Sequence, residues 1–243
     1  MSQLALAVEA GVTPRHVSFV ESGRATPSRE MVLLLARTLD VPLRERNQML
    51  LAAGYAPIYR ETGIAEPAMS QVRAALERVL RYHEPFPAVV MDRHWNLMLT
   101  NAAAASMFTW LLGNGRSTSP PNVLRLMFDP GGLRPYVANW EQVGEALIQR
   151  VHREAVGGVP DAETAALLRQ VLGLPGIPDR WRTPDFTATP TPVVPVQFRK
   201  GHLGVSYFSM VTTVGTPLDV TAQEIRLESF FPADEATALK RWT

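Results

Sequence analysis

The sequence predicts an α+β protein with an all-α N-terminal domain and a second domain in which an antiparallel sheet carries helices. Residues 2–53 place apolar side chains at helical spacing between short glycine and proline turns. Beyond a proline-containing linker at residues 55–68, short β-rich runs stand on both sides of a helical middle region. We therefore predict two domains, residues 1–66 and 67–243, and the 46% hydrophobic content is enough to give each a core.

Composition restricts the classes of function. The sequence holds no cysteine, which excludes disulfides, Cys-ligated zinc and thiol nucleophiles and fits a reducing compartment. No apolar run reaches the roughly 18 residues of a spanning helix and no secretory signal opens the chain, so we expect a cytoplasmic protein without a membrane partner. The net charge is +1, and residues 1–66 hold seven Arg against seven acidic residues. Any nucleic-acid-binding face must then be a local patch.

Two short helices joined by a glycine turn are predicted at the N-terminus. Ser2 can cap a helix that runs to about Ala10, and Gly11 can end it in the left-handed conformation that glycine allows. Thr13 and Pro14 then start the next helix as its N-cap and first helical residue. This arrangement predicts a helix-turn-helix, whose second helix lies in the major groove of DNA.

The second of these helices has an unusual outer face. Val17 and Val20 point to one side of a helical wheel, while the other side shows an arginine, hydroxyls and an aromatic ring. Arginine can donate to guanine O6 and N7, serine can bond a base edge or a phosphate, and phenylalanine can touch a thymine methyl group. The candidate DNA-contacting residues are Gln3, Thr13, Pro14, Arg15, Ser18, Phe19, Ser22 and Arg24.

The second domain is predicted to hold a sheet that cradles helices. Residues 87–101 indicate two strands around a tight turn at Asp92–His94, and Asn101 can cap the alanine-rich helix that follows. The order of strand, strand, helices and three more strands is that of a PAS-type domain. The last three strands are predicted in "PVVPVQFRK", "HLGVSYFSMVTTV" and "DVTAQEIRLESFF".

The N-terminal residues resemble the XRE (Cro/CI-type) helix-turn-helix family. The likeness lies in the Ser-Gln start, the Ala-Gly-Val turn, the Glu-x-Gly-Arg exit and the later Pro-Ser of residues 2–54. It implies double-stranded operator DNA and a homodimer as partners. Such domains have five helices, so we expect the first helix, which should precede Ser2, to be missing and Met1 to be internal to a longer protein. Without that helix, Glu21 is expected to be an unpaired, partly buried carboxylate.

Residues 68–243 resemble the ligand-binding domain of MmyB-like transcription regulators, a PAS-like module found behind this kind of helix-turn-helix. The resemblance implies a cavity for a hydrophobic small-molecule effector, with a fatty acid or similar amphiphile as the leading candidate and no required cofactor. The motifs that carry it are "RYHEPFPAVVMDRHWNLMLTNAAAASMF", "NVLRLMFDPGG" and "VTTVGTPLDVTAQEIRLESFFP".

Alternate strand residues and helix faces supply the candidate cavity wall, although residues at such spacings are more often plain core. Methionines adapt to irregular shapes, and the chain has nine. A carboxylate head group needs a charged or amide partner, for which Arg125 is the first choice, before His94 and Asn101. The candidate ligand-binding residues are Val89, Met91, Leu97, Leu99, Asn101, Met107, Phe108, Leu124, Arg125, Met127, Phe128, Val205, Phe208 and Met210.

Enzyme motifs are not found in the sequence. It has no G-x-S-x-G elbow, H-E-x-x-H, P-loop or G-x-G-x-x-G, and its five histidines are scattered. We expect no catalytic residue and no metal site. The predicted function is that of a bacterial transcription regulator, whose effector alters domain arrangement or dimer geometry. The alternatives are a protein–protein interaction module with an apolar groove and a non-functional helix-turn-helix, and an enzyme with an uncatalogued site.

Overall fold

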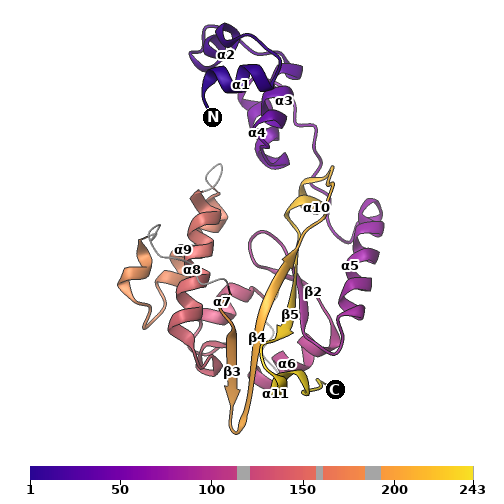
Figure 1. Cartoon of the computed structure of the whole chain (residues 1–243), viewed down its shortest axis with the longest axis vertical. Helices are drawn as coiled ribbons and strands as arrows, with labels where there is room; N and C mark the ends of the chain where they lie inside the picture. The colour runs from indigo at the N-terminus through magenta and orange to yellow at the C-terminus, as the bar shows by residue number, and fades with distance from the viewer. Residues whose placement is uncertain (114–120, 157–160, 184–192, 243) are drawn as a thin grey trace. The chain divides into compact units, whose positions relative to one another are not determined.

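The computed structural model describes residues 1–113, 121–156, 161–183 and 193–242 (Figure 1). The chain divides into two compact units. The N-terminal unit consists of Met1–Glu66 together with Val214–Gln223. The sheet unit consists of Pro67–Thr213 and Glu224–Thr243.

Helices of the N-terminal unit begin where the sequence predicts. The hydroxyls of Ser2 and Thr13 each accept a hydrogen bond from a backbone N–H in the following first turn, which confirms these two predicted N-caps, and Ser28 caps the third helix in the same way. Leu6 and Val17 meet in a small core with alanines of the first helix, so the glycine turn joins two helices that pack together. The helices are α1 (Gln3–Glu9), α2 (Pro14–Glu21), α3 (Arg29–Thr38) and α4 (Leu43–Ala52).

Two segments of this unit differ from expectation. The linker after α4 is held to that helix, because Asn47 Nδ2 donates to Tyr59 O at 2.7 Å and Asn47 Oδ1 accepts from the backbone of the same segment. The start of "DVTAQEIRLESFF" is a short helix, α10 (Val220–Glu224), and not the predicted strand. The reason is local: Asp219 Oδ1 accepts from Ala222 N, which satisfies a first-turn donor and favours a helix.

The sheet unit holds one five-stranded sheet in the order β2-β1-β5-β4-β3, with every neighbouring pair antiparallel. All four residues of β1 are buried, so both faces of the sheet are covered at its centre. This architecture confirms the predicted α+β fold with an antiparallel sheet. The strands are β1 (Ala88–Met91), β2 (Leu97–Thr100), β3 (Val196–Lys200), β4 (Leu203–Thr212) and β5 (Arg226–Pro232).

Helices lie on both sides of this sheet (Figure 1). One large apolar core joins β1, β3 and β4 to α6–α9 and buries the side chains of Trp181, Phe128 and Tyr207 almost completely. On the other side, α5 packs against β1 through Leu76 and Leu80. The helices are α5 (Ser70–Tyr82), α6 (Ala102–Leu112), α7 (Val123–Phe128), α8 (Trp140–Val156), α9 (Ala162–Leu172) and α11 (Glu235–Ala238).

Candidate functional site

The outer face of α2 brings together the two residues expected to contact bases. The guanidinium carbon of Arg15 lies 5.1 Å from the centroid of the Phe19 ring, a cation–π contact that orients both side chains. Arg15 is exposed, Phe19 and Ser18 are half-buried, and Val17 is buried beneath the helix. The helix therefore presents a charged and aromatic surface on the side away from its core.

Several other DNA-contact candidates are engaged within the unit. Gln3 Nε2 donates to Glu21 Oε2, Thr13 caps α2, and Ser22 Oγ donates to Phe19 O at 3.3 Å. The expectation of an unpaired, partly buried Glu21 was wrong, because this carboxylate is exposed and pairs with Gln3 across the α1–α2 turn. Pro14 and Arg24 are exposed.

Most candidate ligand-binding residues meet in the large core of the sheet unit. Leu97 and Phe108 are half-buried and pack against it. The core members among the candidates are Val89, Met91, Met107, Leu124, Met127, Phe128 and Val205.

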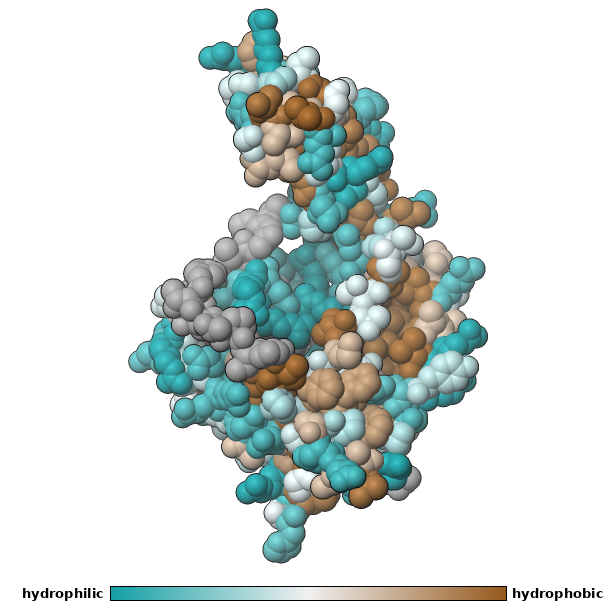
Figure 2. Space-filling model, in the orientation of Figure 1, coloured by the Kyte–Doolittle hydropathy of each residue, from teal (hydrophilic) through white to brown (hydrophobic). Residues whose placement is uncertain are grey.

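Besides Asn101, which is described below, four candidates are not part of that core. Phe208 and Met210 face the other side of the sheet, where Phe208 stacks on Phe231 at 5.6 Å between ring centroids. Met210 is 58% exposed. Figure 2 shows hydrophobic side chains gathered on one face of the sheet unit, towards α5. Leu99 lines a surface pocket, and Arg125 is exposed on α7.

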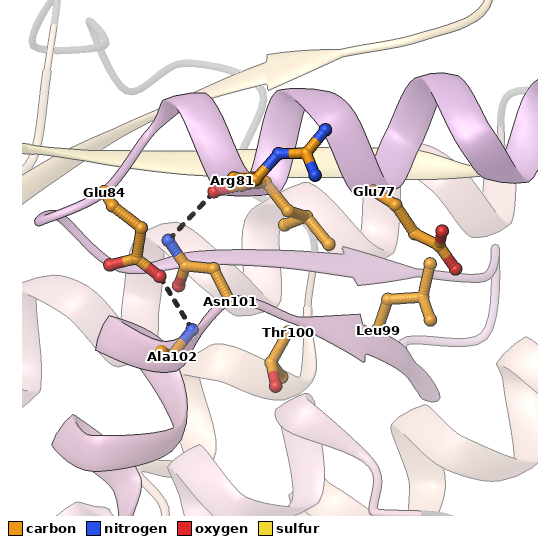
Figure 3. Close-up of a pocket in the computed structure, with 8 residues that line it drawn as sticks. Glu77, Arg81, Glu84, Leu99, Thr100, Asn101 and Ala102 are labelled. Carbon is orange, nitrogen blue, oxygen red and sulfur yellow. Dashed lines mark hydrogen bonds between the residues drawn. The ribbon is translucent and has the colours of Figure 1, made fainter.

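Asn101 is buried, and its side-chain amide forms all of its hydrogen bonds within the fold. Its Oδ1 accepts from Ala88 N and Ala104 N, while its Nδ2 donates to Phe86 O and to Leu80 O, the last of which is drawn in Figure 3. All four sites of the amide are thereby occupied, since an asparagine offers two donors and two lone pairs. Asn101 joins β1, α5 and α6 and has no group left for a ligand.

An open pocket of about 340 Å³ lies beside Asn101, between α5 and β2 (Figure 3). Arg81 and Glu77 project over it from α5, and Leu99 and Thr100 lie beneath. At one end of the pocket, Glu84 Oε1 accepts a hydrogen bond from Ala102 N. The sequence analysis did not predict this pocket, because it depends on how α5 crosses the edge strand.

A polar cluster borders the large core at Trp95. The guanidinium carbons of Arg150 and Arg226 lie 4.6 and 6.0 Å from the Trp95 ring centroid, and both groups contact Glu154 Oε1, at 3.1 and 2.8 Å. Trp95 is 2% exposed and adopts a positive φ of 67°. Among the described residues, four buried side-chain atoms lack a hydrogen-bond partner, and two of them, Trp95 Nε1 and Glu154 Oε2, belong to this cluster; the others are His16 Nε2 and Trp181 Nε1. The sequence analysis missed this cluster, whose members come from three distant segments.

Two family models match the chain. The model described as the MmyB-like transcription regulator ligand binding domain matches residues 72–241, well over half of the chain. The chain belongs to the MmyB-like transcription regulators. A helix-turn-helix model matches residues 1–46. Together they support a DNA-binding transcription regulator with a ligand-sensing domain, which confirms both resemblances found in the sequence.

Other comparisons add little to this MmyB-like regulator. No curated protein matches it. It is 11% identical to a solved structure described as "Structure of an RNA-binding Light-Oxygen-Voltage Receptor", with a TM-score of 0.32. That match covers 95% of this chain and 52% of the other, so this chain spans about half the length of that protein. A likeness at this TM-score carries no inference about fold or function.

A second charged cluster of the MmyB-like domain lies at the β1–β2 turn. Arg93 contacts Asp161 Oδ2 at 2.9 Å and Glu224 Oε1 at 3.2 Å, and His94 Nε2 lies 2.9 Å from the same Asp161 oxygen. Burial raises the pKa of the Asp161 carboxyl, but a hydrogen bond from Thr164 and the charge of Arg93 outweigh burial and bring it to about 2. His94 thus contacts a carboxylate of its own domain.

Within the described ranges, no group of three or more His, Asp or Glu side chains could hold a metal ion. In that part of the chain, no helix is both long and apolar enough to cross a bilayer.

Proposed function

We propose that this regulator binds operator DNA through α2 and that an amphiphile, a fatty acid or a molecule like it, binds in the large core of the sheet unit as the effector. The observation that carries the effector proposal is the pair of buried, unpartnered polar atoms, Trp95 Nε1 and Glu154 Oε2, at the border of an apolar core. The border of this apolar core holds a free donor, Trp95 Nε1, and a free acceptor, Glu154 Oε2. It therefore suits a ligand with an apolar tail and a head group that both accepts and donates hydrogen bonds, as a protonated carboxylic acid does.

Binding of a head group at this border is favoured by the free energy of hydrogen bonding. A buried polar group without a partner costs about 1–3 kcal/mol, so a head-group oxygen that accepts from Trp95 Nε1 recovers that loss. Arg150 and Arg226 share one Glu154 oxygen, and their remaining N–H groups can donate to a second carboxylate. An ordered water is the competing occupant of such a position.

The apolar tail would enter among flexible side chains. Met91, Met107 and Met127 belong to the core next to Trp95, and methionine repacks around a guest more readily than branched residues do. The effector would thus open a core that is closed in its absence, with Trp95 holding the polar end.

Operator recognition is assigned to Arg15, Ser18 and Phe19. Arg15 would read guanine in the major groove, and Arg24 would contact phosphate. We further propose a homodimer, because helix-turn-helix regulators bind two half-sites about 34 Å apart on palindromic operators.

The effector test is native mass spectrometry of the purified chain, followed by denaturing extraction and titration with palmitate. We expect a stoichiometric amphiphile or saturable palmitate binding, weakened about tenfold in Trp95→Phe, which keeps an aromatic ring and removes Nε1. Trp140→Phe is the matched control and should bind palmitate like the wild type. An empty protein that ignores palmitate would contradict the effector proposal.

The interaction-module alternative has one observation in its favour, the open pocket between α5 and the edge strand β2. An extended peptide can add to a strand edge and place side chains in such a pocket. Capture of a peptide at this pocket by a chain that binds no operator DNA would favour that function.

A further inference from the structure

Residues 214–223 lie in the N-terminal unit, although they fall inside the family match to the ligand-binding domain, residues 72–241. They connect β4 to β5 of the sheet. The chain thus leaves the sheet at Thr213, packs with the helix-turn-helix helices, and returns at Glu224. A simple surface loop between two paired strands would need only a few residues.

This connection completes a helix of the N-terminal unit. Leu43 N, the first donor of α4, donates to Gln223 Oε1 at 2.7 Å across 180 residues of sequence. Pro42, at the N-cap position of α4, makes no side-chain cap hydrogen bond. Free N–H groups at a helix start need a partner, and here Gln223 supplies one.

Two further contacts bind the same connection to the segment after α4. Thr62 Oγ1 donates to Asp219 Oδ2 at 2.6 Å, and Val220 N donates to Arg60 O at 2.8 Å. Thr62 and Val220 are 8% and 1% exposed, so these hydrogen bonds are shielded from water. Since Asn47 holds the preceding residues to α4, the connection, the linker and α4 form one hydrogen-bonded group.

The sheet unit holds the chain directly beyond this point. Glu224 pairs with Arg93 of the β1–β2 turn, and Arg226 pairs with Glu154 of α8 beside Trp95. Within the four residues from Gln223 to Arg226, the backbone passes from the cap of α4 to the polar cluster at the core border.

We infer that the β4–β5 connection, residues 214–223, couples the effector site to the helix-turn-helix by making or releasing the cap on α4. The regulatory part of this inference rests on the proposed function. An effector at Trp95 rearranges Arg226 and Glu224, and Gln223 and Asp219 move with them. The effector thereby shifts the populations of a capped and an uncapped state of α4, and with them the stability of the DNA-binding helices.

The first test uses amide hydrogen exchange of the full chain without any ligand. The variant Asp219→Ala/Gln223→Ala should raise exchange in residues 42–62 about tenfold and leave β1 and β5 unchanged. Thr221→Ala, on the same short helix, is the matched control and should leave residues 42–62 protected. Unchanged protection in the double variant would overturn the inference.

A second variant acts from the sheet unit. Arg93→Gln removes one ion pair of Glu224, the one with the β1–β2 turn, without altering any residue of the N-terminal unit. The inference predicts a change of exchange in residues 42–62, whereas an effect confined to the sheet unit would contradict it. Arg73→Gln, which removes only an exposed ion pair on α5, is the control.

The third test measures how palmitate changes operator affinity. In the wild type palmitate should shift the operator Kd about fivefold or more, and in the double variant each ligand should still bind but without influence on the other. An equal shift in both proteins would overturn the inference. If palmitate does not bind the wild type, the effector proposal is wrong. The two hydrogen-exchange experiments then test by themselves whether the β4–β5 connection couples the two units.

Discussion

Nε2 of His94 lies 2.9 Å from Oδ2 of Asp161, and Arg93 contacts the same carboxylate oxygen from the β1–β2 turn. Asp161 also caps α9, where it accepts from Glu163 N and Thr164 N. One carboxylate thus fixes the start of a helix and the turn next to Trp95.

This arrangement predicts an acid-labile contact. The pKa of Asp161 is lowered from 3.8 to about 2, so its contribution to stability is fully present above about pH 4 and is lost as the pH falls towards 2. We expect about 1 kcal/mol, because solvent screening reduces the effect at a partly exposed group. Asp161→Asn should show a flatter dependence of the unfolding free energy on pH between 5 and 2, in a urea titration series. Glu163→Gln is the control, and parallel curves for wild type and Asp161→Asn would contradict the assignment.

Asn101→Ala is predicted to be strongly destabilising. It removes the cap of α6 and leaves the buried donors and acceptors of its four partners without hydrogen bonds. We expect a loss of about 3 kcal/mol, measured by urea unfolding of the full chain. Asn139→Ala, at a half-buried asparagine, should cost less. Equal losses in the two variants would show that the Asn101 network matters little.

Gly144→Ala tests the packing of α8 on the aromatic core. A Cβ at this position would lie 2.5 Å from Cη2 of Trp181, a ring that is fully buried. We predict a destabilisation of about 1–3 kcal/mol from overpacking, visible as a lower urea midpoint. At Gly215 a Cβ meets nothing within 4 Å, so Gly215→Ala should be close to neutral. A neutral Gly144→Ala would mean that Trp181 can move.

Arg15→Ala tests the recognition face of α2. We expect a loss of about 1–3 kcal/mol in binding to an operator selected from random duplexes, with less effect on unrelated DNA. The reason is that a base contact carries specificity, whereas a phosphate contact does not. Arg78→Ala, an exposed arginine on α5, should leave operator binding unchanged. Unaltered specificity in Arg15→Ala would place the recognition residues elsewhere.

Local signals in the sequence predicted most elements correctly. N-cap residues such as Ser28 and Asn101 act over three residues, so they can be recognised without any tertiary structure. The short helix α10 was mistaken for a strand because its β-branched residues outweighed the cap at Asp219.

The candidate ligand residues show a different limit. Phe208 and Met210 stand an odd number of residues from Val205, so strand alternation alone places them on the opposite face. Leu99 could not be placed that way. In the pairing of β1 with β2, Val90 lies opposite Leu99 and Met91 lies opposite Leu97, so the register shifts between these two pairs. Such a bulge disturbs the alternation of side chains along β2, and the face on which Leu99 lies cannot be read from the sequence.

Long-range relationships could not be predicted from the sequence. The cap that Gln223 provides for α4 joins residues 180 positions apart, and the Trp95 cluster depends on α8 and β5 meeting at one turn. No spacing rule connects such residues, because only the folded topology brings them together.

The most direct test of the central claim is the affinity of the full chain for its operator with and without saturating palmitate, measured by fluorescence anisotropy at one fixed salt concentration. The account predicts that palmitate changes the operator Kd at least about fivefold in the wild type and clearly less in Trp95→Phe. An identical Kd with and without palmitate, in a protein shown to bind palmitate, would contradict it.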